Sequence, residues 1–206
     1  MTEKETRKEA IKAFESAIKE GVSFKNKVLF KFPFYQGDRL SDQLIKIIAD
    51  NIFGLNLKEV KDIHPVLFLN EERVIEIEAI CETGKTIKIS FHNGDYSKEQ
   101  IRLVQLYEFK MFADQEERIN ERYELLYPVY QVFFTNGIDK RHPDLFDIFQ
   151  YRNDEGILLD GNLTNRAYVY LPYINTIIKQ KGIDNLSDFE KIVLIIADAM
   201  MIETTK

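Results

Sequence analysis

The stretch VIEIEAICETGKTIKISFH, residues 74–92, carries the pattern that decides the fold. Two arms of alternating apolar and polar residues flank a Thr-Gly pair, which is typical of a β-hairpin. Because successive side chains of a strand point to opposite faces, the hairpin has one apolar and one polar face. The apolar face takes Ile75, Ile77, Ala79, Ile87, Ile89 and Phe91, and the polar face takes Glu76, Glu78, Lys88, Ser90 and His92.

The loop of this hairpin determines which residues lie opposite one another. A three-residue loop at 83–85 keeps apolar residues opposite apolar residues, whereas a two-residue loop at Thr83-Gly84 mixes the two faces. The longer loop requires a positive φ at its glycine or at a neighbouring residue. It predicts that Glu76 lies opposite His92 and that Glu78 lies opposite Ser90.

The polar face of the hairpin has two interpretations. Carboxylates beside a histidine could bind a divalent metal ion and activate water. Alternatively, the same residues form a solvated strand face with a favourable cross-strand Glu–His pair. Composition and spacing leave both interpretations open.

The segments around the hairpin predict helices and further strands. Capping residues mark helix starts at Thr2, Ser41, Ser97 and Ser187, and the apolar spacing that follows each is helical. Pro65 indicates that the extended segment 59–70 is an edge strand or an interrupted strand, because proline lacks the amide donor that a central strand needs. The predicted helices cover 1–21, 41–54, 97–117 and 187–203, and the predicted strands cover 59–70, 127–134, 145–151 and 166–171. This order predicts an α/β sandwich around a mixed sheet.

Composition limits the class of protein. The chain has 206 residues, a net charge of −6 and a single cysteine, Cys81. We therefore expect a reducing, cytoplasmic environment and no cysteine metal cluster. The charged opening MTEKETRKEA argues against secretion, and the apolar runs are too short to span a membrane. The acidic balance argues against coating nucleic acid by bulk charge, but a nuclease with a carboxylate site would also be acidic.

Several short motifs occur in a recognisable order along the chain. They are KVLFK at 27–31, the hairpin turn ETGK at 82–85, Arg102 with Tyr107, YELLYPVY at 123–130 and YLPY at 170–173. Together, over about residues 24–205, they resemble the PD-(D/E)XK nuclease family transposases, which include the Rpn recombination-promoting nucleases. The resemblance implies a restriction-endonuclease-like α/β/α sandwich around a mixed central sheet. It divides the chain into an N-terminal helix appendage, 1–21, and a nuclease-like domain, 22–206.

The departures from the family pattern fall on its chemistry. In the family, carboxylates on the hairpin would hold Mg²⁺ and an adjacent polar residue would orient the attacking water. Here the three motif positions are occupied by Glu76 in place of Asp, Ser90 in place of Glu and His92 in place of Gln. Lys27 occupies the family's first Asp position, and Tyr170 and Tyr173 replace the charged ends of its E-L-P-K motif. The resemblance therefore implies a degenerate catalytic site at Glu76, Ser90 and His92.

Two further sets of candidate residues follow. A surviving metal site would use Glu76, Glu78 and His92, with the imidazole favouring a softer ion such as Mn²⁺ or Zn²⁺. Basic residues that could contact nucleic acid are Lys27, Lys31, Lys88 and Arg102. The segment 22–37 interleaves aromatic residues with lysines, which could stack bases and neutralise phosphates or simply form an apolar connector.

Three functional hypotheses remain at this point. The first is a nuclease-fold protein that has lost catalysis and acts by binding DNA or a protein partner, without a cofactor. The second is an active endonuclease with a variant Glu/His site and Mg²⁺ or Mn²⁺. The third is a structural module that forms homo-oligomers. None of the three involves a membrane.

Overall fold

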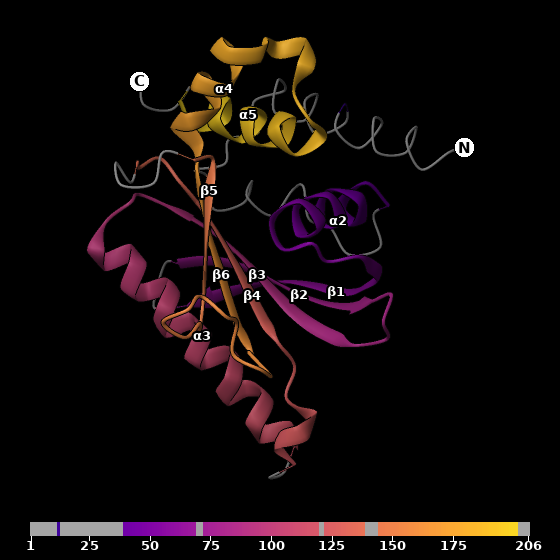
Figure 1. Cartoon of the computed structure of the whole chain (residues 1–206). Helices are drawn as coiled ribbons and strands as arrows, with labels where there is room; N and C mark the ends of the chain where they lie inside the picture. Colours follow the sequence, from indigo (N-terminus) through magenta and orange to yellow (C-terminus); the bar gives the residue numbers. More distant parts are fainter. Residues whose placement is uncertain (1–11, 13–38, 69–71, 120–121, 139–143, 202–206) are drawn as a thin grey trace.

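The protein is a mixed α/β sandwich in which helices cover both faces of a six-stranded sheet (Figure 1). A computed structural model describes Lys12 and residues 39–68, 72–119, 122–138 and 144–201. The predicted α/β sandwich with a mixed sheet is confirmed. Apart from Lys12, the predicted N-terminal helix and the aromatic segment 22–37 lie outside the described residues.

The elements follow the predicted order. The helices are α2 (Arg39–Phe53), α3 (Lys98–Ile119), α4 (Ile174–Lys181) and α5 (Asp188–Met201), with short 3₁₀ turns η1 (Tyr123–Leu125), η2 (Leu171–Tyr173) and η3 (Ile183–Asn185). The strands are β1 (Leu57–Phe68), β2 (Glu72–Cys81), β3 (Thr86–Gly94), β4 (Val129–Thr135), β5 (Phe146–Gln150) and β6 (Thr164–Tyr170). The sequence pattern assigned no range to α4, whose eight residues are too few to show a clear helical period.

The strand order across the sheet is β1-β2-β3-β4-β6-β5. Strands β1, β2 and β3 form an antiparallel meander, and α3 then carries the chain over to β4, which runs parallel to β3. Strand β6 is parallel to β4, and β5 returns antiparallel to β6 at the far edge. Pro65 lies on β1, so its predicted place in an edge strand is confirmed.

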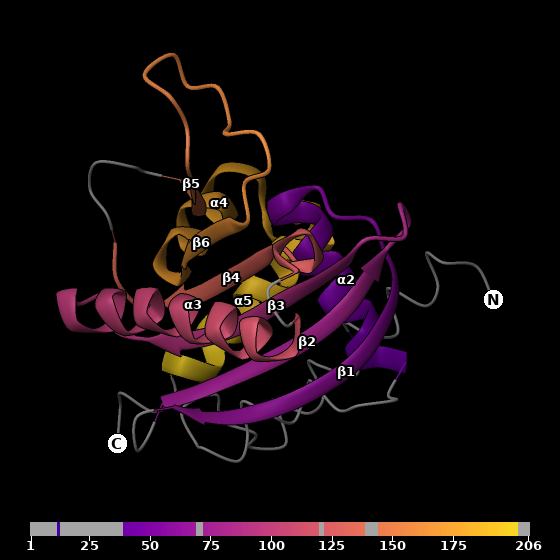
Figure 2. The ribbon, with the colours of Figure 1, turned by 90° about the horizontal axis from the view of Figure 1, so that it is seen from below.

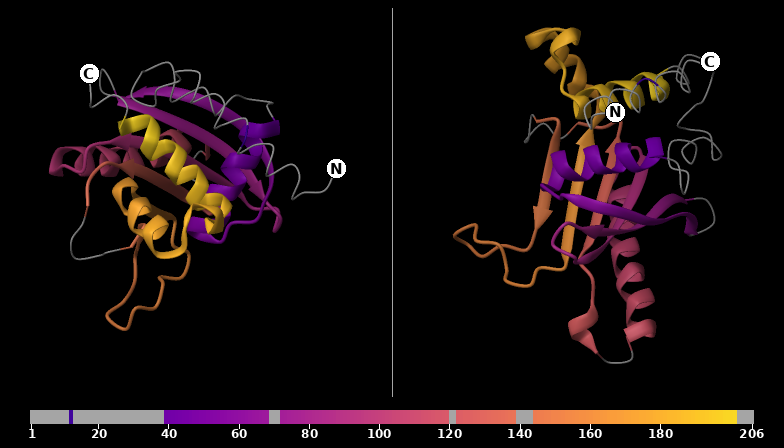
Figure 3. Two further views of the ribbon diagram at one scale, coloured as in Figure 1. Left: turned by 90° about the horizontal axis from the view of Figure 1, so that it is seen from above. Right: turned by 90° about the vertical axis from the view of Figure 1, so that its right-hand side faces the viewer.

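The two faces of the sheet differ in chemistry. Helices α2 and α5 cover one face and α3 covers the other (Figures 2 and 3). The main apolar core lies on the α2 and α5 face and includes Ile45, Ile48, Val193 and Ile196. It also contains the predicted apolar residues of the hairpin: Ile75, Ile77, Ala79, Ile87, Ile89 and Phe91. The polar face of the hairpin consequently lies beneath α3.

The predicted register of the hairpin is wrong by two residues. Glu76 lies opposite Ser90, Val74 opposite His92 and Glu78 opposite Lys88. The loop covers 82–84, because the Cys81 amide donates to the Lys85 carbonyl at 2.9 Å, and Gly84 has the expected positive φ of 81°. A shift of two residues leaves every side chain on the same face, so the apolar pattern could not distinguish the two registers.

Two predicted helix starts are confirmed by hydrogen bonds. The Gln100 amide donates to the Ser97 hydroxyl at 3.1 Å at the start of α3. At α5, the Ser187 amide donates to the Glu190 carboxylate at 2.7 Å and the Glu190 amide donates to the Ser187 hydroxyl at 3.2 Å, a complete capping box. Within the described part of the chain, no helix is both long and apolar enough to cross a membrane.

Candidate functional site

A row of polar side chains crosses the sheet beneath α3. Residues directly opposite one another on successive strands are His64, Glu76, Ser90, Gln131 and Arg166. The row runs perpendicular to the strands, from β1 at one edge through β2, β3 and β4 to β6. Ser90 and Gln131, in the middle of the row, are fully buried. Polar groups buried in this way require internal partners.

Glu76 has its partners on β1 and α3. The Tyr107 hydroxyl of α3 donates a hydrogen bond to Glu76 Oε1. Lys110 Nζ lies 3.8 Å from the same oxygen, and His64 Nε2 lies 3.9 Å from Oε2. Glu76 is 6% exposed, so its negative charge is balanced by these neighbours rather than by bulk water.

Tyr107 closes the site from above. Burial raises the pKa of its hydroxyl far above the usual range, and the Glu76 charge and hydrogen bond raise the pKa further. The phenol therefore stays protonated and remains a donor to Glu76. Its ring also packs edge-on against the His92 ring, with the centroids 5.1 Å apart. Tyr107 therefore contacts both Glu76 and His92.

His92 is held as a neutral imidazole. Its Nε2 atom lies 2.9 Å from the Ser90 hydroxyl and 3.4 Å from the amide nitrogen of Gln131. Burial lowers the pKa of His92 to about 3, and the nearby Arg166 charge contributes in the same direction. The Nε2 nitrogen of the ring is therefore already in contact with two polar side chains of the protein.

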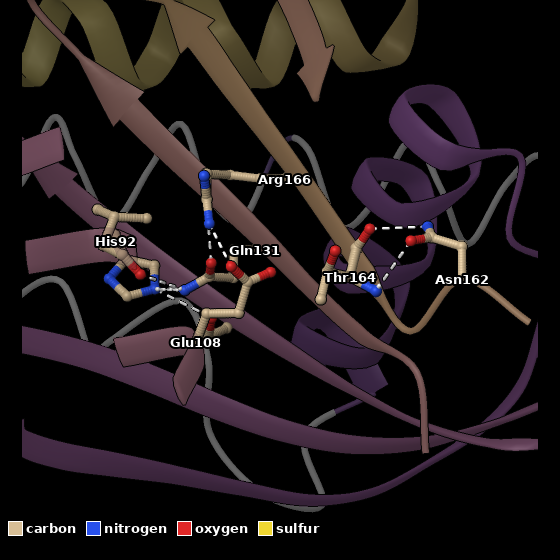
Figure 4. A network of polar contacts seen from close by, with 8 residues as sticks. His92, Glu108, Gln131, Asn162, Thr164 and Arg166 are labelled. Carbon is tan, nitrogen blue, oxygen red and sulfur yellow. Dashed lines mark hydrogen bonds and ion pairs between the residues drawn. The ribbon is translucent and has the colours of Figure 1, made fainter. Parts of the chain in front are cut away.

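The row continues into a buried ion pair on the other side of His92. Gln131 donates through Nε2 to the Val104 carbonyl at 2.9 Å and accepts from Arg166 Nε at 3.2 Å. Arg166 also forms an ion pair with Glu108 of α3. Figure 4 shows His92, Gln131, Arg166 and Glu108 pointing toward one another in one continuous network. Burial raises the pKa of Glu108, and the Arg166 charge partly opposes that rise.

The structure brings together some of the predicted site residues and separates others. Glu76 lies directly opposite Ser90, and His92 follows two residues later on the same face of β3. Glu78 is partly exposed and has Lys61 Nζ 3.8 Å from its carboxylate. Among the described residues there is no group of three or more His, Cys, Asp and Glu side chains that could hold a metal ion.

Of the four basic residues predicted to contact nucleic acid, the structure describes two, which differ in their exposure. Lys27 and Lys31 lie outside the described residues. Lys88 is 6% exposed beneath α3, where its side chain has little access to a phosphate. Arg102, on α3, is exposed.

Glu108, Gln131 and Arg166 belong to the network but were not predicted from the sequence. A signal for two of them existed, because Gln131 and Arg166 are polar residues inside the buried strand segments VYQVFFT and TNRAYVY. A buried parallel strand is expected to be almost wholly apolar, so each polar residue in it suggests a specific partner. The partners themselves depend on the register between β4 and β6, which the sequence does not show.

The nearest pocket opens at one end of the row. It has a volume of about 150 Å³ and is lined by Glu108, Phe149, Gln150, Tyr151, Thr164 and Arg166. Its walls do not include Glu76, Ser90 or His92. A larger pocket of about 660 Å³ lies at the hairpin-turn end of the sheet, where Phe53, Lys85, Tyr130 and Leu159 contribute to its walls. The three motif positions therefore do not line either pocket.

Comparison of the chain with protein-family models, curated proteins and solved structures gave no match.

Proposed function

We propose that this protein has a restriction-endonuclease-like fold in which the residues at the catalytic positions make structural hydrogen bonds. We further propose that it acts by binding DNA or a protein partner without cutting. The order of α2, β1, the β2–β3 hairpin, α3 and β4 is the helix–strand–hairpin–helix–strand order that the PD-(D/E)XK resemblance implies. The antiparallel meander followed by a parallel strand after α3 also supports this fold.

The hydrogen bond from Tyr107 to Glu76 carries the proposal. Mg²⁺ requires several oxygen ligands, of which carboxylates contribute most of the negative charge. The three motif positions here supply one carboxylate, whose Oε1 already accepts a hydrogen bond from Tyr107 and has Lys110 Nζ 3.8 Å away. Ser90 and His92 contact each other instead of facing an ion. A metal ion would have to displace these contacts and lift α3 from the sheet.

A nuclease assay tests the loss of catalysis. We expect the full chain to leave supercoiled plasmid DNA intact in Mg²⁺, in Mn²⁺ and in Zn²⁺. The Glu76→Ala variant should behave in the same way, because it removes a structural carboxylate and not a metal ligand. Metal-dependent nicking by the wild-type protein that disappears in Glu76→Ala would support the active variant endonuclease and contradict our proposal.

A binding titration tests the role of DNA as the partner. Fluorescence anisotropy with a labelled duplex should show affinity that falls steeply with salt, because phosphate contacts release counterions. Arg102→Glu should weaken that binding, and Lys179→Glu, at an exposed lysine of α4 outside the predicted set, serves as the control. Salt-independent or absent binding would assign the binding role to a protein partner.

A further inference from the structure

The two edges of the sheet are built differently. The β1 edge carries the residues and irregularities that discourage pairing with another chain: Lys58, Glu59, Lys61, His64 and Pro65, together with two register shifts. Charged residues, proline and bulges are the usual means of protecting an exposed edge strand. The β1 edge is therefore poorly suited to extend the sheet.

The β5 edge carries less of this protection, with a single charged residue, Asp147, and no register shift. Its sequence, FDIFQ, contains no proline, lysine or arginine. Ile148 and Phe149 are 40% and 43% exposed. Strand β5 is the last strand of the sheet, and within the described part of the chain nothing pairs with its outer side (Figure 3). An exposed edge of this kind is a template for another strand.

The hydrogen bonds to β6 determine which backbone groups of β5 point outward. The Tyr170 amide donates to the Leu145 carbonyl at 2.9 Å, so Leu145 points its backbone carbonyl toward β6. In an antiparallel pair the inward and outward residues alternate. Asp147 and Phe149 therefore bond to β6, whereas the backbone groups of Phe146, Ile148 and Gln150 point away from the sheet. The outward residues form the pairing surface.

We propose that a second copy of this chain pairs with the β5 edge in antiparallel register, with the two-fold axis at Ile148. In this register Ile148 faces Ile148 of the second copy and Phe146 faces Gln150. All these residues have outward backbone groups, so each can exchange hydrogen bonds across the axis. The pairing also covers the exposed Ile148 side chain on both copies.

Charge complementarity favours a second copy over an unrelated strand. A two-fold axis at Ile148 places Asp144 opposite Arg152 at both ends of the pair. Arg152 now donates to the neutral oxygens of Gly156, at 2.7 Å, and Gln150, at 2.8 Å, and no described carboxylate forms an ion pair with it. Opposite charges that face each other across an antiparallel pair stabilise it, whereas like charges destabilise it.

The loop between β5 and β6 supports the same partner. Residues 151–163 project past the β5 edge (Figures 2 and 3). The loop exposes Tyr151, Ile157 and Leu159 at 62%, 60% and 59%. In a two-fold pair each projecting loop would reach the other copy and could bury these apolar side chains against it. The proposed interface is independent of whether Glu76 takes part in DNA cleavage.

Light scattering of the full chain tests the association. We expect a particle of twice the chain mass of 24.3 kDa that dissociates on dilution. Ile148→Lys places two lysines at the axis and should shift the protein to the monomer mass. Ile183→Lys, at a 57% exposed isoleucine in η3, is the matched control and should remain a dimer. A wild-type monomer at all concentrations, or a dimer unaffected by Ile148→Lys, would overturn the proposal.

A cysteine at the axis tests the register itself. Residues opposite each other in a hydrogen-bonded antiparallel pair have Cα atoms about 5.5 Å apart, which a disulfide can bridge. Ile148→Cys should form a covalent dimer under mild oxidation, and Ile183→Cys should not; the buried Cys81 is common to both. Failure of Ile148→Cys to cross-link while the wild-type protein is dimeric would exclude this register.

Charge exchange provides an independent check. Arg152→Asp should weaken the dimer, because it places two aspartates together at each end of the pair. Adding Asp144→Arg should restore the association. A double variant that is as monomeric as the single variant would contradict the predicted pairing of these two residues.

Discussion

Glu76 is a buried carboxylate whose charge is balanced by the protein itself. The Tyr107 hydroxyl and Lys110, both from α3, lie at Oε1, and His64 of β1 lies 3.9 Å from Oε2. A catalytic carboxylate must leave at least one oxygen accessible to a metal ion. At the scale of single residues, therefore, the contacts of Glu76 favour a structural role.

Removing the Tyr107 hydroxyl should destabilise the protein. Tyr107→Phe leaves the buried Glu76 carboxylate without its donor, and the expected loss in the free energy of unfolding is about 1–3 kcal/mol. Urea denaturation measures this change. Tyr151→Phe, at a residue that is 62% exposed, is the control and should change the free energy by less than about 0.5 kcal/mol. Equal stability of the two variants would show that the contact contributes little.

His92 should make the protein less stable in acid. The pKa of His92 is about 3 in the folded protein, whereas a solvent-exposed histidine has a pKa of 6.5, so below pH 6.5 the unfolded chain binds a proton that the folded chain excludes. The stability is therefore fully present above pH 6.5 and is lost as the pH falls toward 3. Between about pH 6.5 and 4.5 the loss from this group is about 2 kcal/mol.

The His92→Gln variant isolates this effect. Glutamine remains neutral, so the free energy of unfolding of the variant should fall less steeply with acid than that of the wild-type protein. Urea denaturation across this pH range measures both slopes. Parallel slopes for the two proteins would mean that His92 is not the titrating group.

At the scale of elements, the Arg166–Glu108 pair joins α3 to β6. Arg166 and Glu108 side chains are 14% and 9% exposed, so each charge depends on the other. Arg166→Met should reduce the free energy of unfolding by about 3 kcal/mol, because it leaves a buried carboxylate without its partner. Replacing both residues, as Arg166→Met with Glu108→Leu, should be less destabilising than the sum of the two single replacements.

A double-mutant cycle in urea measures this coupling. The Lys191–Asp188 pair of α5 provides the control, because its side chains are both 37% exposed and its nitrogen–oxygen distance is 3.8 Å. Its coupling should be below about 1 kcal/mol. Additive effects at Arg166 and Glu108 would show that α3 is held to the sheet by its apolar contacts alone.

At the scale of the whole molecule, divalent ions should not stabilise the fold. A ligand that binds only the native state raises the melting temperature, and the rise grows with the logarithm of the ligand concentration once that exceeds the dissociation constant. Because Tyr107 and Lys110 already occupy Oε1 of Glu76 and no second carboxylate lies at the three positions, we expect the same melting temperature in millimolar Mg²⁺, in Mn²⁺ and in a chelator. A concentration-dependent rise that is lost in Glu76→Gln would show a metal site at this position.

The sequence predicted most of the architecture because its signals are local. Alternating polarity and Pro65 predicted the positions of the hairpin and the β1 edge, and Ser97 and Ser187 predicted the starts of α3 and α5. Helix α2 begins at Arg39, so Ser41 lies inside the helix and is not its cap. The same pattern could not determine the hairpin register, since a shift of two residues keeps Glu76, Ser90 and His92 on one face. It therefore assigned His92 instead of Ser90 as the residue opposite Glu76.

The candidate site was predicted in part. The resemblance indicated Glu76, Ser90 and His92, and the structure brings them together. Gln131 and Arg166 come from strands that are parallel neighbours across long connections, and Tyr107 and Glu108 come from the crossover helix. Their meeting depends on inter-strand register and on the rotation of α3, and neither is encoded in a short stretch of sequence.

By itself, then, the sequence determined which residues form the hairpin, which of its faces is polar and that Glu76 is the single carboxylate among Glu76, Ser90 and His92. Those properties follow from side-chain periodicity and residue identity. Only the tertiary structure decided that the polar face lies beneath α3, with Tyr107 on Glu76 and Ser90 on His92. Burial makes those contacts necessary, because a polar group removed from water must form hydrogen bonds with the neighbours that the fold provides.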